Sequence, residues 1–316
     1  MESPIKLGIS SCLLGEKVRY DGGHKLDHYL TDTLGQFVQW VPVCPEVEYG
    51  LPIPREAMRL VGDPEDPRLV TNRTGIDHTE GMRTWARTRL AALEGEDLCG
   101  FIFKSRSPSS GLKSVKVYTE AGMPSHRGIG IFARAFVERF PLVPVEDDGR
   151  LNDPGLRENF IERIFVFKRW KQFDAGDTGI AGLVDFHSDH KLLIMAHSPK
   201  HLKDLGTLVA EAKKLKMAAL KSLYFQTLMD ALRYLSTVKK NVNVLHHMMG
   251  YFKEVLSADE KQELLAVIDR YHRNLVPLVV PVTLINHYAR KYSEPYLKRQ
   301  HYLNPHPVEL MLRNHV

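Results

Sequence analysis

Residues 6–23 read KLGISSCLLGEKVRYDGG, a short β-type run that leads directly into Cys12 and a polar loop. The run at 37–43 leads in the same way into Cys44, within PVCPEVEYG. A third run is followed by the polar loop KSRSPSSGL at 104–112. Because the carboxyl ends of parallel strands meet at one edge of a sheet, we expect the three loops to converge. This pattern predicts an α/β domain whose functional site lies at that edge.

Alternating strand and helix patterns extend this prediction over the first half of the chain. The predicted helix at 77–93 begins with Asp77 and Glu80 at the spacing of a capping box, and its apolar residues share one face. Such alternation is typical of a mostly parallel sheet with helices on its faces. The other predicted strands are Lys6–Ser10, Gly100–Lys104, Ser114–Tyr118 and Leu142–Val145, and the second predicted helix is Ile129–Phe140.

The segment GIGIFA at 128–133 mimics the glycine fingerprint of a dinucleotide-binding turn. It follows PSHR rather than a predicted strand, and no βαβ unit with an acidic partner follows it. We therefore interpret its glycines as a tight turn into a helix.

The second half of the chain predicts an all-α helical bundle. After a helix at 156–173, the segment DAGDTGIAG (174–182) is a glycine- and aspartate-rich break that suits a domain junction. Ser198, followed by proline, has the residue type of a helix N-cap, and Ser257 and Glu260 have the spacing of a capping box. We expect two domains, residues 1–175 and 185–316.

Composition predicts a folded chain without membrane segments. The 316 residues are 43% hydrophobic and 26% charged, which excludes the disordered and fibrous classes. The N-terminus lacks a basic segment followed by a long apolar one, and the most apolar run, at 275–285, contains two prolines. A membrane helix needs about 20 apolar residues. We therefore expect a cytoplasmic protein with no membrane partner.

Three cysteines are present, Cys12, Cys44 and Cys99. An odd number in a chain expected to be cytoplasmic argues against a disulfide framework. The thiols are therefore metal ligands, nucleophiles or core residues. Cys99 lies just before or within the third strand, at the far end from the loops, so we interpret it as a core residue.

Charge is unevenly distributed along the chain. The formal net charge is +5, but residues 191–316 hold 19 Lys and Arg against 10 Asp and Glu, a net charge of +9. Such a surplus fits a surface for an anionic partner such as nucleic acid, or an ordinary solvated helical surface. Both interpretations stay open.

Three segments carry a specific resemblance: CLLGEKVRYDG from residue 12, PVCPE from residue 42 with Pro54-Arg55 after it, and KSRSPSSG from residue 104. In order and spacing they resemble the signature loops of the thiouracil desulfidase (TudS) family, over residues 5–150. In that family three cysteines, one from each loop, hold a [4Fe-4S] cluster whose fourth iron is open to the sulfur of the substrate. The resemblance implies Cys12 and Cys44 as two of these metal ligands.

The third ligand position departs from the family. Its motif SPSCG reads SPSSG at 107–111, so Ser110 stands where a cysteine ligand is expected. A serine alkoxide is a hard ligand, whereas iron–sulfur clusters are held by soft thiolates. The explanations are a deliberate replacement, a natural variant with weakened chemistry, or rescue by Cys99, which the position of Cys99 disfavours. A zinc site of the three cysteines is a further alternative.

The resemblance also implies roles for other loop residues. Glu46 and Ser107 match positions implicated in acid–base chemistry at the substrate. Asp21, Arg55 and Lys104 lie in the same loops and are candidates to bind the pyrimidine edge or an attached phosphate. The implied reaction is the non-redox removal of sulfur from a thiolated pyrimidine, with thiouracil giving uracil and sulfide. The alternative is a non-catalytic module that binds thiolated bases or RNA and has lost its cluster.

The second half resembles the helical domain of unknown function typified by YbgA, over about residues 188–316. The resemblance is carried by AHSPKHLKDLG, HHMMGYFKEVLS, YHRNLVPLVVPVTLINHY and LNPHPVEL, and it implies no activity. Docking of tRNA, a cover for the cluster and self-association all stay open. Tyr224, Phe225, Tyr251 and Phe252 favour a bundle core over a base-stacking platform.

Overall fold

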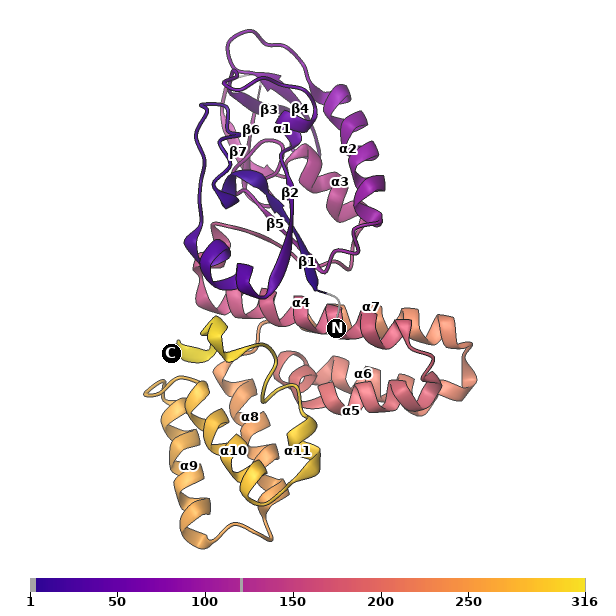
Figure 1. Ribbon diagram of the computed structural model, residues 1–316, viewed down its shortest axis with the longest axis vertical. Helices are drawn as coiled ribbons and strands as arrows, with labels where there is room; N and C mark the ends of the chain where they lie inside the picture. Colours follow the sequence, from indigo (N-terminus) through magenta and orange to yellow (C-terminus); the bar gives the residue numbers. More distant parts are fainter. Residues whose placement is uncertain (1–3, 120–121, 316) are drawn as a thin grey trace. The chain divides into compact units, whose positions relative to one another are not determined.

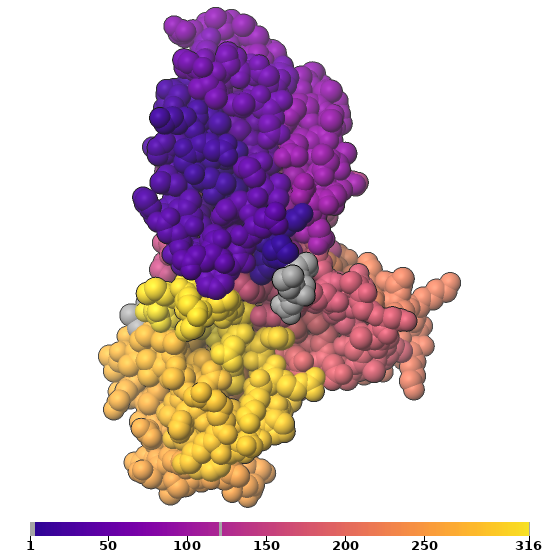
Figure 2. All heavy atoms as spheres, viewed as in Figure 1, coloured from indigo at the N-terminus to yellow at the C-terminus, as the bar shows by residue number. Residues whose placement is uncertain are grey.

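The computed structural model describes residues 4–119 and 122–315. The chain divides into two compact units, residues 1–153 and 154–316. Figure 1 shows strands and helices in the first unit and helices in the second, and Figure 2 shows the heavy atoms in the same view. The predicted combination of an α/β unit with an all-α unit is confirmed.

The first unit contains a four-stranded, entirely parallel sheet. Its strand order is β2-β1-β5-β8, and β1 and β2 are in register from Ile5 beside Val38 to Ser10 beside Val43. Parallel pairing places the carboxyl ends of β1, β2 and β5 at one edge, as the sequence predicted. The strands are β1 (Ile5–Ser10), β2 (Val38–Val43), β5 (Gly100–Phe103) and β8 (Val145–Asp147).

Strand β8 begins later than predicted. The expected strand at 142–145 shares only Val145 with it. Pro144 interrupts the predicted segment, and proline lacks the N–H group that a sheet ladder needs. As a result β8 ends at Asp147, and both Asp147 and Asp148 lie at the carboxyl edge of the sheet.

The sequence did not predict most of a second, mixed sheet with the order β4-β3-β6-β7. In this sheet β3 pairs with β6 in parallel, and its other pairs are antiparallel. Arginine, glycine and proline in its short, half-exposed strands hide the alternation that marks a strand. Because β7 ends at Gly128, the expectation that GIGIFA follows no strand was wrong. The strands are β3 (Met58–Asp63), β4 (Asp66–Thr71), β6 (Val115–Tyr118) and β7 (Pro124–Gly128).

Helices α2 (Thr79–Glu94) and α3 (Ile131–Arg139) pack on the parallel sheet around an aromatic core. The rings of Phe101 and Phe103 stack with centroids 4.2 Å apart, and both rings contact Phe132 of α3. Buried aromatic pairs of this kind contribute strongly to core packing. They fix α3 against β5, the strand that leads into the third loop.

The capping box expected at the start of α2 was wrong. Asp77 accepts the Thr79 N–H at 2.9 Å in a local turn, and the N-cap residue is His78. Glu80 instead contacts Arg83 one turn along the helix. The spacing of Asp77 and Glu80 fits a capping box, but the Asp77 side chain forms this local turn instead.

The second unit is built from helices that Figure 1 shows from α4 to α11. The predicted caps are confirmed: Ser198 accepts the His201 N–H, and Ser257 and Glu260 form a capping box. DAGDTGIAG covers the last two residues of α4, the turn at 176–178 and the first four residues of α5, inside this unit. Of the four aromatic residues expected in the bundle core, Tyr224 and Phe252 are fully buried and Phe225 is partly buried, whereas for Tyr251 the expectation was wrong, because it is 37% exposed. The helices are α4 (Pro154–Ala175), α5 (Gly179–His197), α6 (Pro199–Ala210), α7 (Met217–Leu232), α8 (Val238–Met249), α9 (Ala258–His272), α10 (Val279–Lys291) and α11 (Pro295–Arg299).

None of the helices within the described ranges combines the length and the apolar content needed to cross a membrane.

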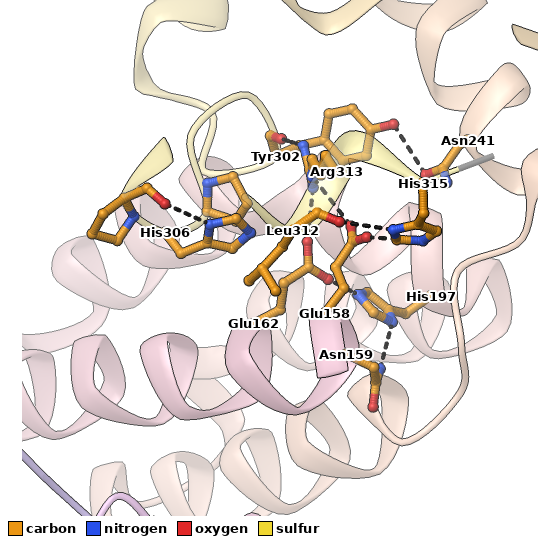
Figure 3. A network of polar contacts seen from close by, with 12 residues as sticks. Glu158, Asn159, Glu162, His197, Asn241, Tyr302, His306, Leu312, Arg313 and His315 are labelled. Carbon is orange, nitrogen blue, oxygen red and sulfur yellow. Dashed lines mark hydrogen bonds and ion pairs between the residues drawn. The ribbon is translucent and has the colours of Figure 1, made fainter. Parts of the chain in front are cut away.

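A buried polar network ties the C-terminal segment of this unit to α4 (Figure 3). Arg313 donates to Glu162 at 2.7 Å and to Glu158 at 3.3 Å. Nε2 of His197 lies 3.0 Å from Glu162, and its Nδ1 lies 2.6 Å from the carbonyl oxygen of Tyr234. Groups from α4, α5 and the last residues of the chain therefore compensate one another's charges inside the bundle.

Candidate active site

One cavity lies at the carboxyl edge of the parallel sheet. Its volume is about 400 Å³, and the loops that follow β1, β2 and β5 all contribute to its walls. Asp21 is not part of the lining, because its carboxylate accepts the Gly23 N–H at 3.0 Å and lies 3.5 Å from the Arg19 guanidinium. The candidate residues that line the cavity are Cys12, Cys44, Glu46, Arg55, Lys104, Ser107 and Ser110.

Short helical turns hold the two thiols in the cavity wall. Cys12 lies in the turn Ser11–Leu14, which ends at Gly15 with a left-handed φ of 91°. Cys44 is the N-cap of helix α1 (Pro45–Glu48). Burial raises the pKa of Cys12 to about 11 and the pKa of Cys44 to about 12, so both groups are protonated at neutral pH. A metal that binds them has to displace both protons.

Glu46 is the residue at which the second and third loops meet. Its Oε1 accepts a hydrogen bond from the Ser109 hydroxyl at 2.6 Å. Its Oε2 lies 3.6 Å from the sulfur of Cys44 and 3.8 Å from Nη2 of Arg55. A carboxylate in the cavity wall with these neighbours is placed to accept or return a proton. Ser109 was not a candidate, because sequence does not tell which serine of SPSSG faces Glu46.

Arg55 lines the cavity and is hydrogen-bonded only in part. Its side chain is 7% exposed, and its Nη2 donates to the carbonyl oxygen of Val18 at 3.0 Å. Its Nε and Nη1 are buried and find no hydrogen-bond partner among the residues that the structure describes. Buried donors are normally satisfied, so the Arg55 guanidinium is unusual in being hydrogen-bonded only in part.

Helix α3 fixes the backbone of the third loop. The N–H groups of Phe132 and Ile131 donate to the carbonyl oxygens of Ser109 and Pro108, at 2.9 and 3.2 Å. Gly130 packs so closely that a Cβ atom there would lie 2.5 Å from the carbonyl carbon of Ser109. The glycine of the GIGIFA segment is therefore required by this close approach of two backbones.

Two carboxylates at the end of β8 also hold the third loop. Asp148 accepts the Lys104 ammonium at 2.7 Å and the Ser105 N–H at 2.6 Å. Asp147 accepts the N–H groups of Leu112 and Lys113 at 3.0 and 3.2 Å. Lys104 therefore lies at the cavity as a cation that is already paired with Asp148. The sequence did not reveal either aspartate as a site residue, because the predicted strand ended before β8 does.

Comparison with known proteins gives each unit a family. The family model described as 2-thiouracil desulfurase matches residues 7–148, and the model described as Protein of unknown function (DUF1722) matches residues 191–307. The chain belongs to the 2-thiouracil desulfurase family through its first unit and to the DUF1722 family through its second. Both resemblances inferred from the sequence are thus confirmed.

Each of three similar proteins covers less than half of this chain. The uncharacterized protein YbgA of Escherichia coli (strain K12) is 31% identical over 153 residues, which cover 48% of this chain and 90% of YbgA. The uncharacterized protein YbbK of Bacillus subtilis (strain 168) is 30% identical over 108 residues, which cover 33% of this chain and 71% of YbbK. A solved structure titled [4Fe-4S]-dependent thiouracil desulfidase TudS is 28% identical, with a TM-score of 0.39, over 47% of this chain and 94% of its own.

The donors in the cavity fit an iron–sulfur cluster at two positions of three. Cys12 and Cys44 offer thiolates, whereas Ser110, which is buried, offers a harder oxygen donor. The N–H of Cys99 bonds to Lys6 at the amino end of β1, so Cys99 cannot complete the set as cluster or zinc ligand. Within the described ranges no three His, Cys, Asp or Glu side chains are grouped to hold a metal ion. Ser110 is therefore the donor available at the third position.

Proposed function

We propose that the first unit removes sulfur from thiolated pyrimidines, so that thiouracil and water give uracil and sulfide. The observation that carries the proposal is the convergence of two thiols and Glu46 in one cavity of a 2-thiouracil desulfurase domain. Hydrolytic removal of sulfur needs a group that binds the sulfur and a group that handles the proton of water. The cavity supplies donors for the first task and a carboxylate for the second.

In this proposal Cys12, Cys44 and Ser110 hold a [4Fe-4S] cluster. When bound, the cluster supplies a Lewis-acidic iron that polarises the thiocarbonyl sulfur. Because both thiols are protonated at neutral pH, loading releases two protons and becomes more favourable as the pH rises. The Ser110 hydroxyl is the weakest of the three donors, since it has to lose a proton of high pKa to bind as an alkoxide.

The protein's own groups bind the base and handle the proton. Arg55, which lines the cavity, binds an oxygen of the pyrimidine, and Glu46 accepts a proton from the attacking water. Ser107 lines the cavity beside that water and is linked to Glu46 through the Ser109 hydroxyl, and Lys104 contributes a fixed positive charge. Asp21 stabilises the loop that carries Arg19 through its bond to Gly23.

Reconstitution with iron and sulfide without oxygen tests the proposal. We expect the Ser110→Cys variant to hold more iron than the parent chain, to show a more persistent cluster absorbance and to release sulfide from thiouracil. A Ser110→Cys variant that binds no cluster, or binds one and releases no sulfide, would overturn the proposal.

A second variant pair assigns the roles in the Ser110→Cys background. Glu46→Gln should keep the cluster absorbance and lose turnover by about 100-fold or more, because only the acid–base group is changed. Cys12→Ala should lose both the absorbance and the turnover. Equal loss of cluster in both variants would give Glu46 a structural role.

The Ser110 hydroxyl favours a second candidate function, a module that binds thiolated bases or RNA without turnover. In that case the parent chain binds thiouracil after treatment with a chelator and releases no sulfide. Isothermal titration with thiouracil, followed by a sulfide assay on the same sample, separates the two functions.

A further inference from the structure

The hydroxyl of Ser109 lies behind the cavity, between the two residues that the proposed function gives acid–base roles. It is fully buried and does not line the cavity, unlike Ser107 and Ser110 in the same loop. Its Oγ lies 2.6 Å from Oε1 of Glu46 and 2.9 Å from Oγ of Ser107. The two acid–base residues therefore share one partner.

The direction of these hydrogen bonds follows from the protons available. The Glu46 carboxylate accepts only, so Ser109 donates its single hydroxyl proton to it. Ser109 Oγ then accepts from the Ser107 hydroxyl. Ser107 Oγ in turn accepts the N–H groups of Ser109 and Ser110, at 3.4 and 3.2 Å. The hydrogen bonds that run from Ser107 through Ser109 to Glu46 therefore fix the orientation of both serine hydroxyls.

The bond from Ser109 is the main contact that orients Glu46. The neighbouring groups of Cys44 and Arg55 lie farther away, at 3.6 and 3.8 Å. A hydroxyl that donates to a carboxylate forms a charge-assisted hydrogen bond, about twice as strong as a neutral one. Removing it frees the carboxylate to adopt other rotamers.

Ser109 is itself held rigidly. Its carbonyl oxygen accepts the N–H groups of Phe132 and Ala133, at 2.9 and 3.2 Å, at the start of α3. Gly130 fills the space beside its backbone, as described above. A group fixed in this way can align a reacting side chain without losing further conformational freedom.

We propose that Ser109 is a positioning residue for sulfur removal, which aligns Glu46 and Ser107 as one hydrogen-bonded unit without touching the substrate. This role rests on the proposed function and deepens it. It predicts that Ser109 acts through Glu46 and Ser107 and not on the substrate directly.

Kinetics in the Ser110→Cys background test this role. We expect Ser109→Ala to lower kcat by about 10- to 100-fold while KM and the cluster absorbance stay unchanged. Ser109→Thr keeps the hydroxyl and should restore most of kcat. Added to Glu46→Gln, Ser109→Ala should lower kcat by less than about threefold, because residues that act as one unit are not additive. An unchanged kcat for Ser109→Ala, or a full additional loss beside Glu46→Gln, would overturn the role.

A crystal structure of the metal-free chain gives a readout that does not depend on activity. Ser109→Ala should show Glu46 in more than one rotamer, where the parent chain shows one. One unchanged Glu46 rotamer in Ser109→Ala would overturn the role.

The failure of this role is distinguishable from the failure of the proposed function. Ser198→Ala removes another buried serine hydroxyl, the cap of α6 in the second unit, and should leave kcat unchanged. If the Ser110→Cys background shows no turnover, the proposed function fails, and the rotamers of Glu46 still decide whether Ser109 positions it. If the background is active and Ser109→Ala is equally active, only the role of Ser109 fails.

Discussion

Two buried arginines, one in each unit, show how the units differ. The side chains of Arg55 and Arg313 are each 7% exposed. Arg313 donates to two glutamates and to the carbonyl oxygen of Tyr302, so each of its nitrogens has an acceptor. Arg55 donates from Nη2 to the Val18 carbonyl, and its other two nitrogens find no acceptor in the described ranges.

The two arginines differ in how far the neighbouring residues compensate their charge. A buried charge is costly unless acceptors and counter-charges compensate it. The positive charge of Arg313 is balanced by Glu158 and Glu162 of α4. These bonds hold the last residues of the second unit against that helix. Arg55 lines the cavity, and two of its buried nitrogens have no partner in the described ranges, so the residues around it compensate its charge only in part. Equal burial therefore does not imply an equal role.

The largest expected effect is on stability, from the compensated arginine. Arg313→Met leaves Glu158 and Glu162 buried without their guanidinium, and we expect it to lower the free energy of unfolding by about 3–5 kcal/mol. Arg273→Met is the matched control, because Arg273 is 67% exposed and pairs only at the surface with Asp269. Its loss should be below about 1 kcal/mol. Urea unfolding followed by circular dichroism measures both losses, and equal losses in the two variants would show that the Arg313 network adds no more stability than a surface ion pair.

The next expected effect depends on pH. It comes from Asp147, a buried carboxylate that accepts hydrogen bonds from backbone N–H groups. Burial raises the pKa of Asp147 to about 6, against its ordinary value of 3.8. Because the folded pKa is the higher one, its stabilising contribution is complete below about pH 4 and is lost as the pH rises through about 6. We expect Asp147→Asn to reduce the difference in unfolding free energy between pH 4 and pH 8, by up to about 3 kcal/mol. Identical profiles for both proteins in urea unfolding would contradict this.

A smaller effect, on binding rather than stability, is expected from the uncompensated arginine. In the Ser110→Cys variant, Arg55→Met should raise KM for thiouracil by about 10- to 100-fold, the value of hydrogen bonds from a charged donor. The free energy of unfolding should change by less than about 1 kcal/mol, because few of its donors have partners. Steady-state kinetics and urea unfolding test this, with the exposed Arg87→Met as control. If Arg55→Met lowers the free energy of unfolding and leaves KM unchanged, Arg55 has a structural role and does not bind the substrate.

The smallest effect concerns the positive charge of the second unit. Its lysines are partly neutralised, since Lys214 pairs with Glu211 at 2.7 Å and Lys221 with Asp174 at 3.0 Å. We therefore expect the affinity for tRNA to be weak and to change little between two salt concentrations, measured by fluorescence anisotropy. A steep loss of affinity with salt would instead indicate release of counterions from a docked RNA.

The two regions also differ in how much of each could be predicted. The loops of Cys12 and Cys44 follow strands that local pattern reveals, and the direction of parallel strands then brings the thiols together. The Arg313 network gave no such signal, because Arg313 and Glu162 are separated by 151 positions in the chain. Which charges meet inside a helical bundle depends on packing between distant segments, and sequence spacing does not report it.

Local sequence signals were enough to predict strands β1, β2 and β5, the caps at Ser198 and Ser257, and the loops that carry the donors. Tertiary structure decided which groups meet, such as Ser109 with Glu46 and Asp148 with Lys104. It also decided the second sheet, whose strands are stabilised by pairing rather than by their own pattern. The physical reason is that burial, charge compensation and unused donors arise only when distant segments exclude water from one another.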